Sequence, residues 1–185
     1  MTTVDELWYL ADEAQQQAEQ TYHRLTERYD DFLEFETVKH VSRRRFRTVA
    51  ERIKENGAPY GAHTLAYTPD GALLLVRHDG VDLWVLPGGG AHDDERFLEA
   101  AKRELAEEAG IDAEYRGLGM LGQVQFNAGE YHTWGVLPLF EASADPQEPT
   151  IADPDGEISD AEWFETLPPD TRDREQLREW RDRRL

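Results

Sequence analysis

The sequence predicts an α/β domain that follows a helical extension. Two observations lead to this prediction. Apolar residues recur at three- and four-residue steps through the first part of the chain, which is the period of a helix. From about residue 60, short apolar runs alternate with turn residues, which is typical of strands mixed with helices. We therefore place a helical extension at residues 1–57 and an α/β domain at residues 58–185.

The extension is expected to contain two helices. The apolar stripe of the first helix comprises Leu7, Ala11, Ala14, Ala18 and Leu25. The second helix begins at Ser42 and ends at Gly57, because serine accepts hydrogen bonds from first-turn amides and glycine adopts the left-handed conformation that ends helices. We expect the two helices to form a hairpin, and the alanine-rich stripe to pack on the second helix or on a second subunit.

The α/β domain is expected to alternate strands and turns around one central helix. The expected strands are 63–67, 72–76, 83–86, 118–126, 131–140 and 162–164. Glycine-containing turns are expected at 69–71 and 127–129, and a loop rich in Pro and Asp at 144–155. The central helix spans 95–109, with Asp93 and Asp94 as candidate caps. A last helix is expected to begin at Thr171.

The composition is strongly acidic. The 185 residues include 39 Asp and Glu against 20 Lys and Arg, a net charge of −19. Such a charge keeps a chain dispersed, but it also destabilises the fold by self-repulsion, which salt screens. Together with the scarcity of lysine, it resembles proteins of salt-loving microbes, and it opposes nucleic-acid binding by the whole surface. The absence of cysteine excludes disulfides, a thiol nucleophile and Cys-ligated zinc.

We expect neither a signal peptide nor a membrane-spanning helix. No apolar run approaches the ~20 residues that a membrane-spanning helix needs. The start, MTTVDELWYLADEA, carries acids where a signal peptide needs basic residues. We therefore expect a soluble, cytoplasmic protein with no membrane partner.

The central helix carries an unusual set of acids. At 100° per residue, Glu104, Glu107 and Glu108 share one face. Like charges four residues apart destabilise a helix, and acids in its last turn oppose the helix dipole. A divalent cation would offset these costs, and a carboxylate cluster favours a hard ion such as Mg²⁺ or Mn²⁺. The alternative is a solvated acidic face.

The segment that leads into and includes this helix resembles the signature of the Nudix hydrolases. From Gly89 it fits the pattern G-x5-E-x7-R-E-U-x-E-E-x-G-U, in which U is a bulky aliphatic residue. The matching residues are Gly89, Glu95, Arg103, Glu104, Leu105, Glu107, Glu108, Gly110 and Ile111. The resemblance implies a Nudix-type α/β/α sandwich on a mixed sheet. It also implies Mg²⁺- or Mn²⁺-dependent cleavage of a pyrophosphate linkage in a nucleoside diphosphate derivative, such as a nucleotide sugar, a nucleoside triphosphate or a dinucleotide.

The resemblance assigns roles by position. It makes Glu104, Glu107 and Glu108 the metal ligands. Arg103 orients the neighbouring glutamates, and Glu95 is a supporting carboxylate.

Two further positions complete the assignment. Gly88 and Gly89 form the loop that holds the helix in place. Many family members add a carboxylate from a later loop, for which Glu157 is the first candidate and Glu130 the second. The candidate catalytic residues are thus Glu104, Glu107 and Glu157, and the general base is one of these or Glu130.

Several residues outside the signature have two interpretations. Arg77, His78 and Trp134 are candidate substrate contacts, or else surface and core residues. The basic cluster 39–47 could bind phosphates, or it could form a helix surface paired with the chain's many acids, which we favour. A nucleotide-sensing regulator with a nucleic-acid-binding basic segment is therefore the alternative function. We expect a nucleotide-derived small molecule as the partner rather than nucleic acid. The extension has two candidate roles, which are to form a homodimer or to cap the substrate.

Overall fold

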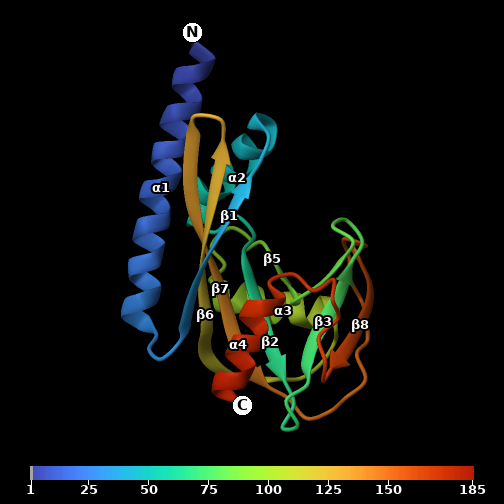
Figure 1. Ribbon diagram of the computed structural model, residues 1–185. Coiled ribbons are helices and arrows are strands. Elements are labelled where there is room, and N and C mark those ends of the chain that lie inside the picture. Colours follow the sequence, from blue (N-terminus) through green and yellow to red (C-terminus); the bar gives the residue numbers. More distant parts are fainter. Residues whose placement is uncertain (1) are drawn as a thin grey trace. The chain divides into compact units, whose positions relative to one another are not determined.

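The structure is a computed structural model that describes residues 2–185, with side chains from Glu6 onward (Figure 1). The chain forms two compact units, which are described separately. The first combines the residues up to Gly61 with Leu121–Pro138, and the second combines Ala62–Met120 with Leu139–Leu185. Strands β6 (Glu114–Ala128) and β7 (Tyr131–Ser143) contribute to both units.

The first unit contains helices α1 (Thr2–Arg28) and α2 (Arg43–Asn56), which pack against each other. The predicted caps of α2 are confirmed. The Ser42 side chain accepts a hydrogen bond from the Arg45 N–H, and Gly57 has a φ of 90°. A Cβ at Gly57 would also collide with the Thr21 side chain. The buried residues of α2 are Phe46, Val49, Ala50 and Ile53.

Residues 33–40 correct the prediction that the whole extension is helical. They form strand β1 (Leu33–His40), which lies beside β6 in the sheet. Half-buried and exposed residues alternate along this strand, as expected for a strand with one packed face. The Phe35 ring lies so close to Gly122 that a Cβ there would be 2.6 Å from its Cζ atom. This long-range contact favours a strand over the helical continuation.

The second unit is built on a mixed sheet. Its other strands are β2 (Ala62–Tyr67), β3 (Leu73–His78), β4 (Leu83–Val85), β5 (Gly88–Gly89) and β8 (Ile158–Phe164). The order is β6-β7-β2-β3-β4, with β5 paired to β2 and β8 paired to β3. The β2–β7 pair is parallel, with His63 opposite Leu139, whereas β3 pairs with β2, β4 and β8 antiparallel.

Helices cover both faces of this sheet. The side chains of β2 alternate, so that Thr64 contacts the Ala101 carbonyl of α3 (Phe97–Glu108), and Ala66 shares a core cluster with Leu105. On the opposite face, Tyr67 contacts Trp180 of α4 (Arg174–Arg184), with ring centroids 5.7 Å apart. This arrangement is the α/β/α sandwich that the sequence predicts.

Local details correct three boundaries. Asp94 does not cap α3: its φ is 63°, and Arg96 occupies the N-cap position. Thr171 does not cap α4, because its hydroxyl donates to the Pro168 carbonyl and Asp173 occupies the N-cap. The turn expected at 127–129 begins later, since β6 extends to Ala128. Among the described helices, none is long and apolar enough to cross a membrane.

Candidate functional site

The glycine strand β5 carries the chain from the sheet into the α3 region. Gly88 pairs with His63 and Gly89 with Ala62 of β2. A Cβ at Gly88 would collide with the Ala62 carbonyl and the His63 ring, and one at Gly89 would lie 2.7 Å from the Glu104 Oε1 atom. Glycine is therefore required at Gly88, where the loop approaches the β2 backbone, whereas a side chain at Gly89 would displace the Glu104 carboxylate.

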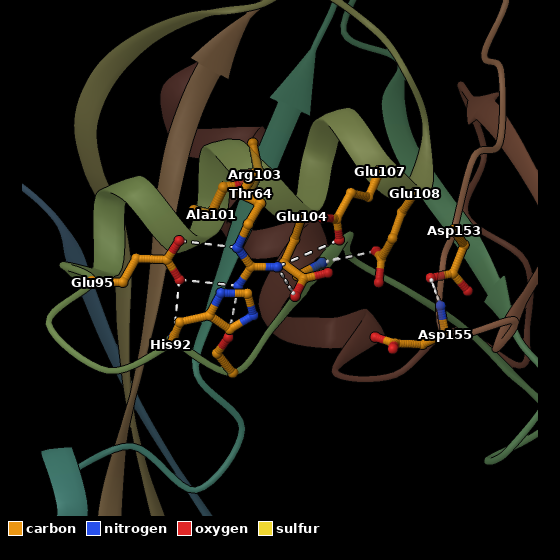
Figure 2. A network of polar contacts seen from close by, with 12 residues as sticks. Thr64, His92, Glu95, Ala101, Arg103, Glu104, Glu107, Glu108, Asp153 and Asp155 are labelled. Carbon is orange, nitrogen blue, oxygen red and sulfur yellow. Dashed lines mark hydrogen bonds and ion pairs between the residues drawn. The ribbon is translucent and has the colours of Figure 1, made fainter.

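Arg103 is the centre of the polar network that Figure 2 shows. Its Nε and Nη2 atoms donate to Glu95 at 2.9 and 3.0 Å, and its Nη2 atom also donates to the Gly90 carbonyl at 2.9 Å. Its Nη1 atom donates to Glu104 at 2.8 Å and to Glu107 at 3.4 Å. One guanidinium thus ties the loop to two of the three predicted metal ligands.

Glu95 acts in this network as a strongly held anion. Besides both contacts from Arg103, it accepts a hydrogen bond from the His92 backbone N–H at 2.9 Å. The Arg103 hydrogen bonds are the main cause that lowers the pKa of Glu95 to about 2, and the Glu95 hydrogen bond likewise raises the pKa of Arg103. The predicted supporting carboxylate is therefore placed to hold the arginine.

Two of the three glutamates on the α3 face are buried. Glu104 is 7% exposed and Glu108 is 6% exposed. Burial raises the pKa of Glu104 despite the Arg103 contact. Burial also raises the pKa of Glu108 to about 8, although the Gly88 N–H donates to its Oε2 atom at 3.0 Å. Two buried carboxylates one helical turn apart make this face a costly place for negative charge.

The donor set has the chemistry of a hard-cation site. Glu104, Glu107 and Glu108 lie on one side of α3 and offer only oxygen donors (Figure 2). In the part of the chain that the structure describes, no three His, Cys, Asp or Glu side chains are gathered closely enough to hold a metal ion. The carboxylates of Glu104 and Glu107 are both paired with Arg103. The residues therefore fit the ion chemically, and holding it would require part of the Arg103 pairing to be exchanged.

The loop before β8 brings further carboxylates to the same region. The Asp153 carboxylate accepts hydrogen bonds from the backbone N–H groups of Asp155, Glu157 and Ile158 at 3.2, 2.6 and 3.0 Å. Negative charge on Asp155 contributes to the raised pKa of Glu104, and charge on Asp153 and Glu157 to that of Glu108. Sequence reasoning named Glu157 as a candidate and did not name Asp153 or Asp155, although the Asp-Pro-Asp-Gly run is a turn signal. The catalytic role of Glu157 stays a prediction.

The two predicted substrate contacts of β3 have different surroundings. Arg77 pairs with Asp82 and Asp170, and its guanidinium lies 5.8 Å from the centroid of the Trp84 ring. His78 places its Nε2 atom 3.3 Å from the Glu157 carboxylate. The structure therefore joins His78 to a candidate catalytic residue. Contact of Arg77 or His78 with substrate stays a prediction.

Trp134 and Glu130 belong to the other compact unit. Trp134 is half-buried in β7, and the edge of its ring contacts Tyr22 with centroids 6.4 Å apart. Glu130 is exposed in the turn between β6 and β7. The roles considered for these two residues, a substrate contact and a general base, stay predictions.

His63 is a residue of the site that sequence reasoning missed. Its imidazole lies against Gly88, and burial is the main cause that lowers its pKa to about 4. Its Nδ1 atom is enclosed and makes no hydrogen bond among the described residues. No sequence signal marked it, because His63 reaches Gly88 only through the pairing of β2 with β5.

Comparisons with known proteins agree with this geometry. The NUDIX domain family matches residues 58–182 of the chain. A Bacillus subtilis (strain 168) protein provisionally named an 8-oxo-dGTP diphosphatase is 33% identical over 89 residues, which are 48% of this chain and 60% of that protein. An RNA pyrophosphohydrolase of Xylella fastidiosa (strain Temecula1) is 40% identical over 58 residues, which are 26% of this chain and 30% of that protein. The chain spans 60% or less of the length of these curated relatives.

A solved structure matches more of the chain at low identity. It is the NUDIX domain of Shewanella oneidensis NrtR complexed with ADP ribose. The likeness covers 86% of this chain and 92% of that one, with a TM-score of 0.50 and 19% identity. This likeness concerns the fold.

Proposed function

The chain belongs to the Nudix family, and from this premise we propose that it hydrolyses a pyrophosphate linkage in a nucleoside diphosphate derivative. One observation carries the proposal. It is the pair of buried carboxylates, Glu104 and Glu108, beside the Gly88–Gly89 strand. Nudix hydrolases generally use divalent metal ions, and a buried acidic pair gains most from such an ion.

The substrate class follows from the same reasoning. A diphosphate carries several negative charges, so a cation must screen it before water can attack phosphorus. The relatives named above are a diphosphatase and a pyrophosphohydrolase, both consistent with this bond type. We include nucleotide sugars, nucleoside triphosphates and dinucleotides in the proposed class.

Mg²⁺ or Mn²⁺ would be held by Glu104, Glu107 and Glu108. When bound, the ion would neutralise charge on the diphosphate and favour attack by water. The chain's own groups do the positioning. Arg103 orients Glu104 and Glu107, Glu95 holds Arg103, and the Gly88 N–H orients Glu108.

The general base is proposed to be a carboxylate that is not held by Arg103. Glu157 meets this condition, because its contact is with His78 and its side chain is 60% exposed to water. An ionised carboxylate near the reacting water can accept its proton.

The test is a substrate panel in high KCl with Mg²⁺ or Mn²⁺. The panel contains nucleoside triphosphates, 8-oxo-dGTP, nucleotide sugars that include ADP-ribose, and dinucleoside polyphosphates, with products separated by chromatography. We expect turnover of at least one compound, loss of activity with EDTA, and weakened Mn²⁺ binding in Glu107→Gln. No turnover of any compound, together with unchanged metal binding in that variant, would refute the proposal.

A second candidate function has a specific observation in its favour. Arg43, Arg44, Arg45 and Arg47 form no ion pair with an acid among the side chains that the structure describes. The first turn of α2 also contains no acid, so these cations oppose the helix dipole without compensation. Among the side chains from Glu6 onward, the expected pairing of this cluster with the chain's own acids is not seen for these arginines.

Exposed aromatic rings lie near these arginines. Trp8 is 50% exposed and Tyr9 is 71% exposed. Trp8 and Arg43 both contact the Tyr131 ring, at 5.8 Å between ring centroids and 5.4 Å from the guanidinium carbon. Arginines beside exposed rings suit single-stranded nucleic acid, whose bases stack and whose phosphates pair. This is the surface that a nucleotide-sensing regulator would use.

The test is fluorescence anisotropy with labelled single-stranded RNA and duplex DNA over a KCl series. We expect salt-dependent RNA binding that is lost in the triple variant Arg43→Ser, Arg44→Ser, Arg47→Ser and kept in an α4 control with Arg178→Ser and Arg183→Ser. No binding at the lowest salt that keeps the fold excludes this function. If light scattering instead finds a dimer that Trp8→Ala dissociates, the surface serves homodimerisation.

A further inference from the structure

We propose that His78 is a positioning residue that holds the Glu157 carboxylate in its working orientation. The inference rests on the proposed function, because it assigns a partner to the candidate general base. It concerns the loop before β8 and the corner that follows β3.

The pairing of β3 with β8 brings the side chains of His78 and Glu157 close together. Arg77 pairs with Asp160 and His78 with Ile158, so the register shifts between Arg77 and His78. Such an irregularity re-aims the side chain that follows it. Here the His78 Nε2 atom lies 3.3 Å from the Glu157 Oε2 atom.

The backbone selects the tautomer of His78. The Gly80 N–H donates to the His78 Nδ1 atom at 3.1 Å, so Nδ1 acts as an acceptor. In the neutral ring the proton is then on Nε2, the atom that lies 3.3 Å from the Glu157 Oε2 atom. The ring lies close to Gly80, where a Cβ would be 3.0 Å from the His78 Cε1 atom. Glycine at this position thus permits the contact that sets the tautomer.

The Glu157 backbone is tied to the same corner. The Asp79 N–H donates to the Glu157 carbonyl at 2.9 Å, and the Ser159 hydroxyl donates to Asp79 at 2.6 Å. The Glu157 N–H donates to Asp153 at 2.6 Å. The backbone is therefore fixed, and the remaining freedom lies in a side chain that is 60% exposed. An exposed glutamate samples many rotamers unless a partner selects one.

The Glu157 carboxylate, whose orientation His78 selects, interacts electrostatically with the acidic face of α3. Charge on Glu157 contributes to the raised pKa of Glu108, so the carboxylate lies within electrostatic range of the buried acids. A base that is already oriented loses less freedom on reaching the reactive arrangement. His78 therefore acts through Glu157 and need not touch the substrate.

A matched pair of amide variants separates this role from a purely structural one. In His78→Gln the amide nitrogen takes the place of Nε2 and reaches Glu157, while the acceptor for Gly80 is lost. In His78→Asn the amide oxygen takes the place of Nδ1 and can accept from Gly80, while the contact with Glu157 is lost. Both variants are neutral and polar, and His132→Asn serves as a control for loss of an exposed histidine.

We expect His78→Gln to keep kcat within a few-fold of the unmodified protein. We expect His78→Asn to lower kcat about tenfold or more, with KM nearly unchanged, because orientation of a general base is used in the chemical step. Glu157→Gln should lower kcat at least as much. Adding His78→Asn to Glu157→Gln should cost nothing further, since both changes remove one function.

The reverse order, with His78→Asn active and His78→Gln impaired, would mean that the Gly80 contact alone matters and would overturn the proposal. So would multiplicative effects in the double variant, or a Glu157→Gln variant with full activity. If the unmodified protein turns over no substrate, the proposed function fails instead. Side-chain ¹⁵N NMR then tests the pair without activity: the His78 spectrum must show the Nε2–H tautomer and must shift in Glu157→Gln, and an unchanged spectrum overturns the proposal.

Discussion

The buried carboxylate of Glu108 predicts that a neutral replacement stabilises the metal-free protein. Glutamine at this position has nearly the same shape, and its side-chain oxygen can still accept the hydrogen bond from the Gly88 N–H. It removes the cost of burying a charge on a side chain that is 6% exposed. We therefore expect Glu108→Gln to be more stable than the unmodified protein at high pH without metal.

The pKa of Glu108 determines the direction and the size of this change in the free energy of unfolding. Folding raises the pKa of Glu108 from 4.5 to about 8. Between these values the folded state keeps a proton that the unfolded state releases, so the free energy of unfolding falls as the pH rises through this window and levels off above it. At about 1.4 kcal/mol per pH unit the loss approaches ~5 kcal/mol. Because the surroundings relax, we expect Glu108→Gln to recover about 2–4 kcal/mol at pH 8.5, or roughly 5–15 °C in Tm.

The assay is thermal unfolding followed by circular dichroism from pH 4.5 to 9 at constant high KCl, with EDTA or with Mg²⁺. The two proteins should have the same Tm near pH 4.5, and the difference between their Tm values should grow as the pH rises. With Mg²⁺ the order should reverse, because the variant has lost a ligand and gains less from the ion. Glu148→Gln, an exposed acid without a role in the site, controls for the change in net charge. A Glu108→Gln variant that is less stable without metal at pH 8.5, or one with the same pH dependence, would refute the reasoning.

Three further predictions follow from the same network and from the composition. Glu95→Gln should cost about 1–3 kcal/mol in urea unfolding at neutral pH, since it weakens charged hydrogen bonds from Arg103. In the unmodified protein the stabilisation by Glu95 should be lost as the pH falls from 4.5 towards about 2, because folding lowers the pKa of Glu95. A Glu95→Gln variant that is as stable as the unmodified protein at neutral pH and at pH 2 would contradict this. Gly89→Ala should weaken Mn²⁺ binding about tenfold in calorimetry, because its Cβ would lie 2.7 Å from the Glu104 Oε1 atom, and Gly90→Ala, where a Cβ meets no atom within 4 Å, should not. Raising KCl from 0.2 to 3 M should raise Tm, because salt screens the net charge of −19, and a flat or falling Tm would count against the salt-loving character.

Features that depend only on residues close together in the sequence were predictable from the chain alone. The caps of α2 at Ser42 and Gly57 are local, and so is the helical period that puts Glu104 and Glu108 on one face of α3. The strands β2 and β4 lie close to their predicted ranges, because turn residues delimit them. The signature from Gly89 to Ile111 indicated the family for the same reason, since it is a local pattern of one loop and the helix that follows it.

Strand β1 shows where local patterns were insufficient. Its segment was assigned to the helical extension, yet its residues lie in a sheet beside β6, from a distant part of the chain. The packing of Phe35 on Gly122 stabilises the strand, and no spacing within residues 33–40 reveals that partner. Tertiary contact overrides local preference in such segments.

In the candidate site, too, some features follow from the local sequence and others require the tertiary structure. The sequence by itself determined which glutamates share a face, because a helix sets that geometry within two turns. Only the tertiary structure decided that Glu104 and Glu108 are buried, that Arg103 joins Glu104 and Glu107 to Glu95, and that His78 meets Glu157. Burial and charge pairing depend on atoms that are distant in sequence. The acids could therefore be located from the chain, but their pKa values and partners required the fold.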